Sequence, residues 1–99
     1  MDCARVVQLL RDSRDYLRAE YGVSRIGLFG SVARGEADES SDVDIIVEFE
    51  RPVGLQFVEL ADYLEDLLGR DVDLLTPAGI QAIRSPHIAE SIRQGVVYV

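Results

Sequence analysis

The stretch that decides the fold runs from residue 23 to residue 49 and reads VSRIGLFGSVARGEADESSDVDIIVEF. It contains two short apolar segments, 23–29 and 42–49, and the second is rich in the β-branched residues that favour strands. The polar segment between them predicts one short helical turn after Gly30 and then a loop. Because this link is short, we expect the two strands to be antiparallel neighbours.

Helical patterns flank this stretch on both sides. Residues 2–21 have apolar side chains at helical spacing, with Asp2 as a plausible N-cap and Gly22 as the C-terminal stop. Residues 55–68 have a strong apolar face and predict a second long helix. The rest of the chain predicts a third strand, two short helices and a last strand. These elements are expected at 71–75, 76–84, 87–94 and 96–99.

The connections predict the topology of the sheet. The helix over 55–68 is long enough to cross over between two strands, which makes the strands at 42–49 and 71–75 parallel. The predicted fold class is therefore α/β (α+β), with a small mixed sheet and helices mainly on one face. A chain of 99 residues predicts a single domain over 1–99.

This topology brings acidic residues to one edge of the sheet. Because side chains alternate along a strand, Asp42 and Asp44 share one face, and Asp71 and Asp73 share a face of the third strand. Two like charges about 4 Å apart repel by roughly 4 kcal/mol at an effective dielectric constant near 20. A divalent cation would remove this repulsion, and oxygen ligands without a His or Cys cluster favour Mg²⁺ or Mn²⁺.

The turn at Gly30 and Ser31 supplies a complementary feature. It leaves a strand and enters a helical turn, so its free backbone N–H groups can attract a phosphate, and glycine lets the phosphate approach closely. Arg34 in the same loop is a secondary candidate for a triphosphate oxygen. A phosphate site facing a metal–carboxylate cluster is typical of phosphoryl or nucleotidyl transfer.

These residues carry a resemblance to a known family. Gly30-Ser31, ten intervening residues and Asp42-Val43-Asp44 resemble the G-S-x10-D-x-D motif of the DNA polymerase β nucleotidyltransferase superfamily. The run GSVARGEADESSDVDIIVEF is similar to the minimal nucleotidyltransferases (MNT, MntA-type), the antitoxins of HEPN/MNT toxin–antitoxin pairs. The third carboxylate of that family matches Asp73, although simple alternation leaves Asp71 as an alternative.

The resemblance implies a nucleotidyltransferase fold and a metal-dependent enzyme. Asp42, Asp44 and Asp73 would bind Mg²⁺ and carry catalysis, with Asp73 helping to deprotonate the acceptor hydroxyl. Gly30 and Ser31 would bind the triphosphate of ATP. In this family branch the acceptor is a tyrosine of the partner HEPN ribonuclease toxin, which is silenced by the transferred AMP.

Two other functions remain open at this point. One is an antitoxin that neutralises its toxin by contact alone, and the other is a nucleotidyltransferase acting on a small molecule. The length of 99 residues argues against the small-molecule enzyme, because it leaves no second domain to hold a small substrate.

Composition bounds the partners and the location. The chain has 18 acidic and 10 basic residues, a net charge of −8, so we expect no direct nucleic-acid binding and favour a basic partner. No apolar run of about 18 residues and no signal peptide are present, so no membrane association is expected. Cys3 is the single cysteine and can form no internal disulfide, which fits a cytoplasmic location.

Overall fold

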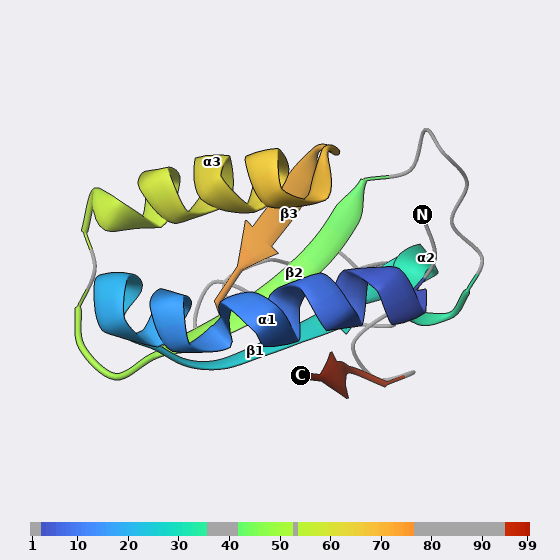
Figure 1. The fold of residues 1–99 in the computed structure, drawn as a ribbon, viewed down its shortest axis with the longest axis horizontal. Helices are drawn as coiled ribbons and strands as arrows, with labels where there is room; N and C mark the ends of the chain where they lie inside the picture. The colour runs from blue at the N-terminus through green and yellow to red at the C-terminus, as the bar shows by residue number, and fades with distance from the viewer. Residues whose placement is uncertain (1–2, 36–41, 53, 77–94) are drawn as a thin grey trace, which may run out of the picture.

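The structure, a computed structural model, describes residues 3–35, 42–52, 54–76 and 95–99 (Figure 1). Its helices and strands follow one another in the order α1 (Cys3–Tyr21), β1 (Val23–Phe29), α2 (Gly30–Ala33), β2 (Val43–Phe49), α3 (Gln56–Leu68), β3 (Val72–Leu75) and β4 (Val97–Tyr98). Where they can be compared, the predicted elements agree with these bounds to within one residue. The predicted cap Asp2 and the predicted helices at 76–84 and 87–94 lie outside the described residues, apart from position 76.

The strands form one mixed sheet in the order β3-β2-β1-β4. Strands β1 and β2 are antiparallel, and β2 and β3 are parallel, as the lengths of their connections predicted. The last strand, β4, adds to the outer edge of β1 in antiparallel orientation. This arrangement confirms the predicted mixed sheet.

The core lies between the sheet and the two long helices, which run side by side on one face (Figure 1). Alternation along β2 sends Val43, Ile45 and Val47 into this core, and all three are fully buried. The helices contribute residues spaced three, four or seven apart, as one face of a helix requires. These are Val6, Leu10 and Leu17 of α1 and Leu60, Leu64 and Leu68 of α3.

This packing decides where the acidic residues of β2 lie. Because Val43 and Ile45 face the helices, Asp44 lies on the opposite face of the sheet, near the N-terminal end of β2. The described helices include none that is long and apolar enough to cross a membrane.

Candidate active site

Asp44 occupies the centre of a row of residues that crosses three strands. It pairs with Phe29 of β1 on one side and with Asp73 of β3 on the other. Side chains at paired positions of neighbouring strands point to the same face. The register therefore places Asp73, rather than Asp71, level with Asp44.

The carboxyl groups of Asp44 and Asp73 interact directly. Partial burial, the negative charge of Asp73 and a hydrogen bond with the Asp73 carboxyl raise the pKa of Asp44 to about 6. The charge of Asp42 acts in the same direction, and the Arg34 guanidinium acts against it. The two neighbouring carboxylates thus outweigh the single guanidinium in their effect on the pKa of Asp44.

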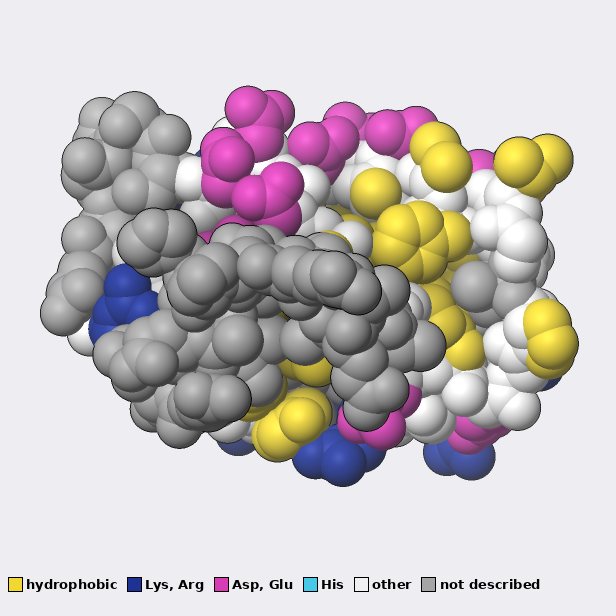
Figure 2. Space-filling model, turned by 180° about the vertical axis from the view of Figure 1, so that it is seen from behind, with side chains coloured by type: hydrophobic (Ala, Val, Ile, Leu, Met, Phe, Trp, Pro, Cys, Tyr) yellow, Lys and Arg dark blue, Asp and Glu magenta, His cyan; other side chains and the backbone are white. Residues whose placement is uncertain are grey.

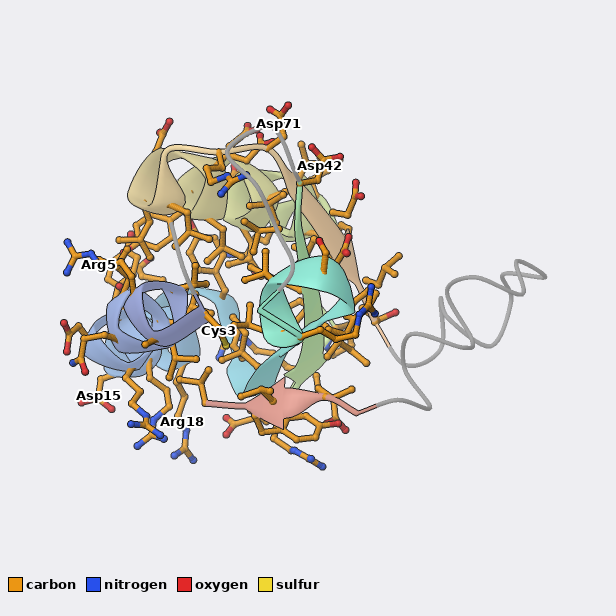
Figure 3. All side chains as sticks on the ribbon, turned by 90° about the vertical axis from the view of Figure 1, so that its right-hand side faces the viewer. Cys3, Arg5, Asp15, Arg18, Asp42 and Asp71 are labelled. Carbon is orange, nitrogen blue, oxygen red and sulfur yellow. The ribbon has the colours of Figure 1, made fainter. Side chains whose placement is uncertain are left out.

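Asp42 and Asp71 lie at the same edge of the sheet as Asp44 and Asp73, each directly before the first residue of its strand. Both side chains are exposed, and Figure 3 shows them close together, above the starts of β2 and β3. The backbone holds these starts in place, because the Val43 N–H donates a hydrogen bond to the Asp71 carbonyl oxygen at 2.9 Å. Acidic side chains continue along the upper edge of the molecule, where α3 and β3 lie (Figure 2). The exposed acids of these elements include Glu59, Asp62 and Asp66 of α3 and Asp73 of β3, and Asp71 directly precedes β3.

Gly30 directly follows β1 and borders the site on the side of that strand. It is buried and adopts a φ of +73°, which L side chains rarely adopt. A Cβ atom at this position would overlap Asp44 Oδ2. Sequence reasoning assigned Gly30 to the approach of a phosphate, whereas the structure shows that it also makes room for the Asp44 carboxylate. This contact depends on the register of β1 against β2, so the sequence motif alone did not reveal it.

Ser31 and Arg34 follow Gly30 in and just beyond the short helix α2. Ser31 is half-buried in its first turn, where Phe29 as N-cap supplies no side-chain hydrogen bond to the backbone. Arg34 is exposed and near enough to Asp44 for its charge to lower the pKa of that carboxyl. The predicted phosphate-binding residues thus lie beside the predicted metal-binding residues.

The chemistry of the donor set suits a hard divalent cation, because carboxylate oxygens predominate. Within the described residues, however, no three acidic, histidine or cysteine side chains are grouped so that they could hold a metal ion. Asp44 and Asp73 form the contacting pair, and Asp42 acts on Asp44 through its charge.

Comparison with known proteins gives the family. A family model described as a nucleotidyltransferase domain matches residues 10–99 of the chain. The chain belongs to the nucleotidyltransferase family. This nucleotidyltransferase is 45% identical over 95 residues to the protein adenylyltransferase MntA of Thermococcus cleftensis. That match covers 95% of this chain and 92% of the relative.

Solved structures agree with this assignment. The nucleotidyltransferase is similar to a structure named as a minimal nucleotidyltransferase, with a TM-score of 0.70 and 35% identity. That similarity covers 98% of this chain and 95% of the other. It is also similar to a toxin–antitoxin crystal structure with AMP-PNP, with a TM-score of 0.62 and 25% identity, over 99% of this chain and 72% of the other. The protein is thus an enzyme of the nucleotidyltransferase class with a minimal nucleotidyltransferase fold.

Proposed function

We propose that this nucleotidyltransferase is the antitoxin of a HEPN/MNT pair and transfers AMP from ATP to a tyrosine of its HEPN ribonuclease toxin. The observation that carries the proposal is that Asp44 lies against Gly30 on one side and Asp73 on the other, because this combines a glycine turn with a carboxylate pair. The relative named protein adenylyltransferase MntA and the toxin–antitoxin structure with AMP-PNP support the same role.

In this proposal the predicted site residues divide into two groups. Asp42, Asp44 and Asp73 hold Mg²⁺, and Asp73 also accepts the proton of the acceptor hydroxyl. Gly30, Ser31 and Arg34 bind the triphosphate of ATP, through backbone N–H groups, a hydroxyl and a guanidinium. Support comes from the adjoining positions of the two groups and from the raised pKa of Asp44, since a bound cation would relieve that repulsion.

The transfer step follows from these roles. The tyrosine oxygen of the partner attacks the α-phosphorus of ATP, and a bond forms between these two atoms. The bond between the α-phosphorus and the oxygen that bridges to the β-phosphate breaks, and pyrophosphate leaves. The hydroxyl proton passes to a carboxylate, for which Asp73 is the exposed candidate beside Asp44. When bound, Mg²⁺ supplies charge stabilisation for the triphosphate.

The test is label transfer from α-labelled ATP to the co-purified partner, with mass spectrometry of that partner for added AMP. Asp44→Asn should abolish transfer while the complex still forms. Asp62→Asn is the matched control, because Asp62 is an exposed acid of α3 and plays no part in the row. Equal transfer by the wild type and Asp44→Asn would refute the role of Asp44.

Neutralisation by contact alone remains the second candidate, because the described acids do not form a complete metal-binding group. The same variant separates the two functions. Toxin neutralisation should be lost in Asp44→Asn if transfer silences the toxin, and it should persist if contact is sufficient.

A further inference from the structure

Three tyrosines form a surface cluster between α1 and α3, which we call the tyrosine patch. It consists of Tyr16 and Tyr21 of α1 and Tyr63 of α3. The ring centroids of Tyr16 and Tyr63 lie 5.0 Å apart, and Tyr21 lies 6.2 Å from each of the other two. Such distances correspond to direct packing of aromatic rings.

The patch is anchored on one side and open on the other. The Tyr63 hydroxyl lies 3.4 Å from the Oγ of Ser13, a buried residue of α1, and donates a hydrogen bond to it. Tyr16 is 46% exposed, although it is one of the larger apolar side chains of the molecule. A ring held by its neighbours and open to solvent loses little conformational freedom when a partner binds.

Acidic side chains surround the tyrosine patch. Asp12 and Glu20 lie four residues before and after Tyr16, and Glu59 lies four residues before Tyr63, so each shares a helix face with a patch residue. Burial raises the pKa of Tyr21, and Tyr16, Glu59 and Glu20 add to the effect, which shows that these acids are close. Helix α3 contains four acidic residues and no basic residue.

We propose that the tyrosine patch is a docking surface for a basic segment of the protein partner, with an arginine or lysine of that partner on the ring of Tyr16. Exposed aromatic faces attract cations, and flanking carboxylates strengthen this attraction. A nucleic acid would be repelled by the same carboxylates. Tyr21 of the patch lies two residues before β1, whereas Asp44 pairs with Phe29 at the other end of that strand.

The proposal deepens the proposed function, since it names the surface that holds the protein substrate. It rests on that function for its biological meaning, but its test involves no transfer reaction. The two experiments can therefore fail separately. Peptide binding at the tyrosine patch without label transfer would count against the proposed function only.

The probe is a hexaarginine peptide, titrated into ¹⁵N-labelled protein at about 0.15 M salt, where long-range attraction is screened. We expect the largest amide shifts around Tyr16 and Tyr63. Tyr16→Leu should weaken binding about fivefold, whereas Tyr16→Phe, which keeps the ring, should stay within about twofold of the wild type.

Two matched controls come from the other side of the molecule. Tyr98 is 44% exposed, but its ring is already covered by the Arg25 guanidinium, 3.8 Å from the ring centroid, so Tyr98→Leu should leave binding unchanged. Asp15 lies on the side of α1 away from α3 (Figure 3), so Glu59→Gln should weaken binding more than Asp15→Asn does.

Three results would overturn the proposal. In the first, Tyr16→Leu binds the peptide as the wild type does, and Glu59→Gln and Asp15→Asn weaken binding equally. This would mean that the peptide is attracted to an acidic protein in general. Another is a set of amide shifts confined to the residues around Asp44 and Asp73. The third is sedimentation showing a dimer of the free protein that Tyr16→Leu dissociates, because the patch would then bind a second copy.

Discussion

Gly30 lies against the carboxylate of Asp44 so closely that one added methyl group would overlap Asp44 Oδ2. The position of Asp44 in β2 therefore depends on the absence of a side chain at Gly30, directly after β1. The glycine is needed for a contact between protein groups as well as for the approach of a phosphate.

The first prediction compares two glycines that have the same backbone conformation. Gly30 and Gly35 both have a φ of +73°, but a Cβ on Gly35 would meet nothing within 4 Å. Gly35→Ala should lower the free energy of unfolding by about 1 kcal/mol, through backbone strain alone. Gly30→Ala should lower it by about 1–3 kcal/mol more, through the additional clash. Urea denaturation measures both changes.

Label transfer should separate the same two variants. Gly30→Ala displaces the Asp44 carboxylate and should reduce transfer at least about tenfold, which corresponds to about 1.4 kcal/mol in the barrier. Gly35→Ala should retain transfer. Equal activities in the two variants would show that the contact between Gly30 and Asp44 does not matter for catalysis.

The second prediction concerns pH and the metal-free protein. The pKa of Asp44 is about 6 in the folded chain, above its ordinary value of 3.8, so the folded state binds this proton more tightly than the unfolded state. Its contribution to stability is therefore greatest below the ordinary pKa and is lost as the pH rises through about 6. In EDTA, Asp44→Asn should gain stability relative to the wild type between pH 4 and 7.

Urea denaturation across this pH range, with Asp62→Asn as the control, measures the effect. Asp62→Asn removes one negative charge from the exposed side of α3, so it controls for the loss of a carboxylate as such. A constant difference in stability between the wild type and Asp44→Asn at every pH would contradict the raised pKa.

The third prediction distinguishes the two acids of the third strand. Asp73 is level with Asp44, whereas Asp71 precedes β3 and is exposed at the rim. Asp73→Asn should reduce magnesium-dependent ATP binding at least about tenfold, and Asp71→Asn less than about threefold. Calorimetry with and without Mg²⁺ measures this. The reverse order would make Asp71 the metal ligand.

The fourth prediction tests the core that positions β2. Leu64 of α3 is fully buried, so Leu64→Ala should lower the free energy of unfolding by about 2–5 kcal/mol. Leu55, one residue before the same helix, is 86% exposed, so Leu55→Ala should change it by less than about 0.5 kcal/mol. Chemical denaturation at one pH compares the two variants directly, and comparable losses would contradict the observed burial.

Periodicity and connection lengths predicted most of the fold. Alternation along β2 placed Val43 in the core and Asp44 on the other face, and the crossover through α3 correctly predicted a parallel β3. These features are local, or they follow from chain connectivity, which is why sequence reasoning could reach them.

The details of the site were beyond that reasoning. Whether Asp73 or Asp71 meets Asp44 depends on the register between β2 and β3, and alternation places both acids on the same face. The contact between Gly30 and Asp44 likewise depends on the register of β1 against β2. Registers are set by packing across the whole sheet, so the local pattern left them open.

The parallel pairing of β2 with β3 has one more consequence. Asp44 and Asp73 are far apart along the chain and meet only when α3 has folded back over the sheet. The hairpin of β1 and β2 can form by local closure, but the acid pair needs this slower, long-range step. The acid pair therefore exists only in chains in which this crossover is complete, so copies in which α3 and β3 are unfolded should be inert.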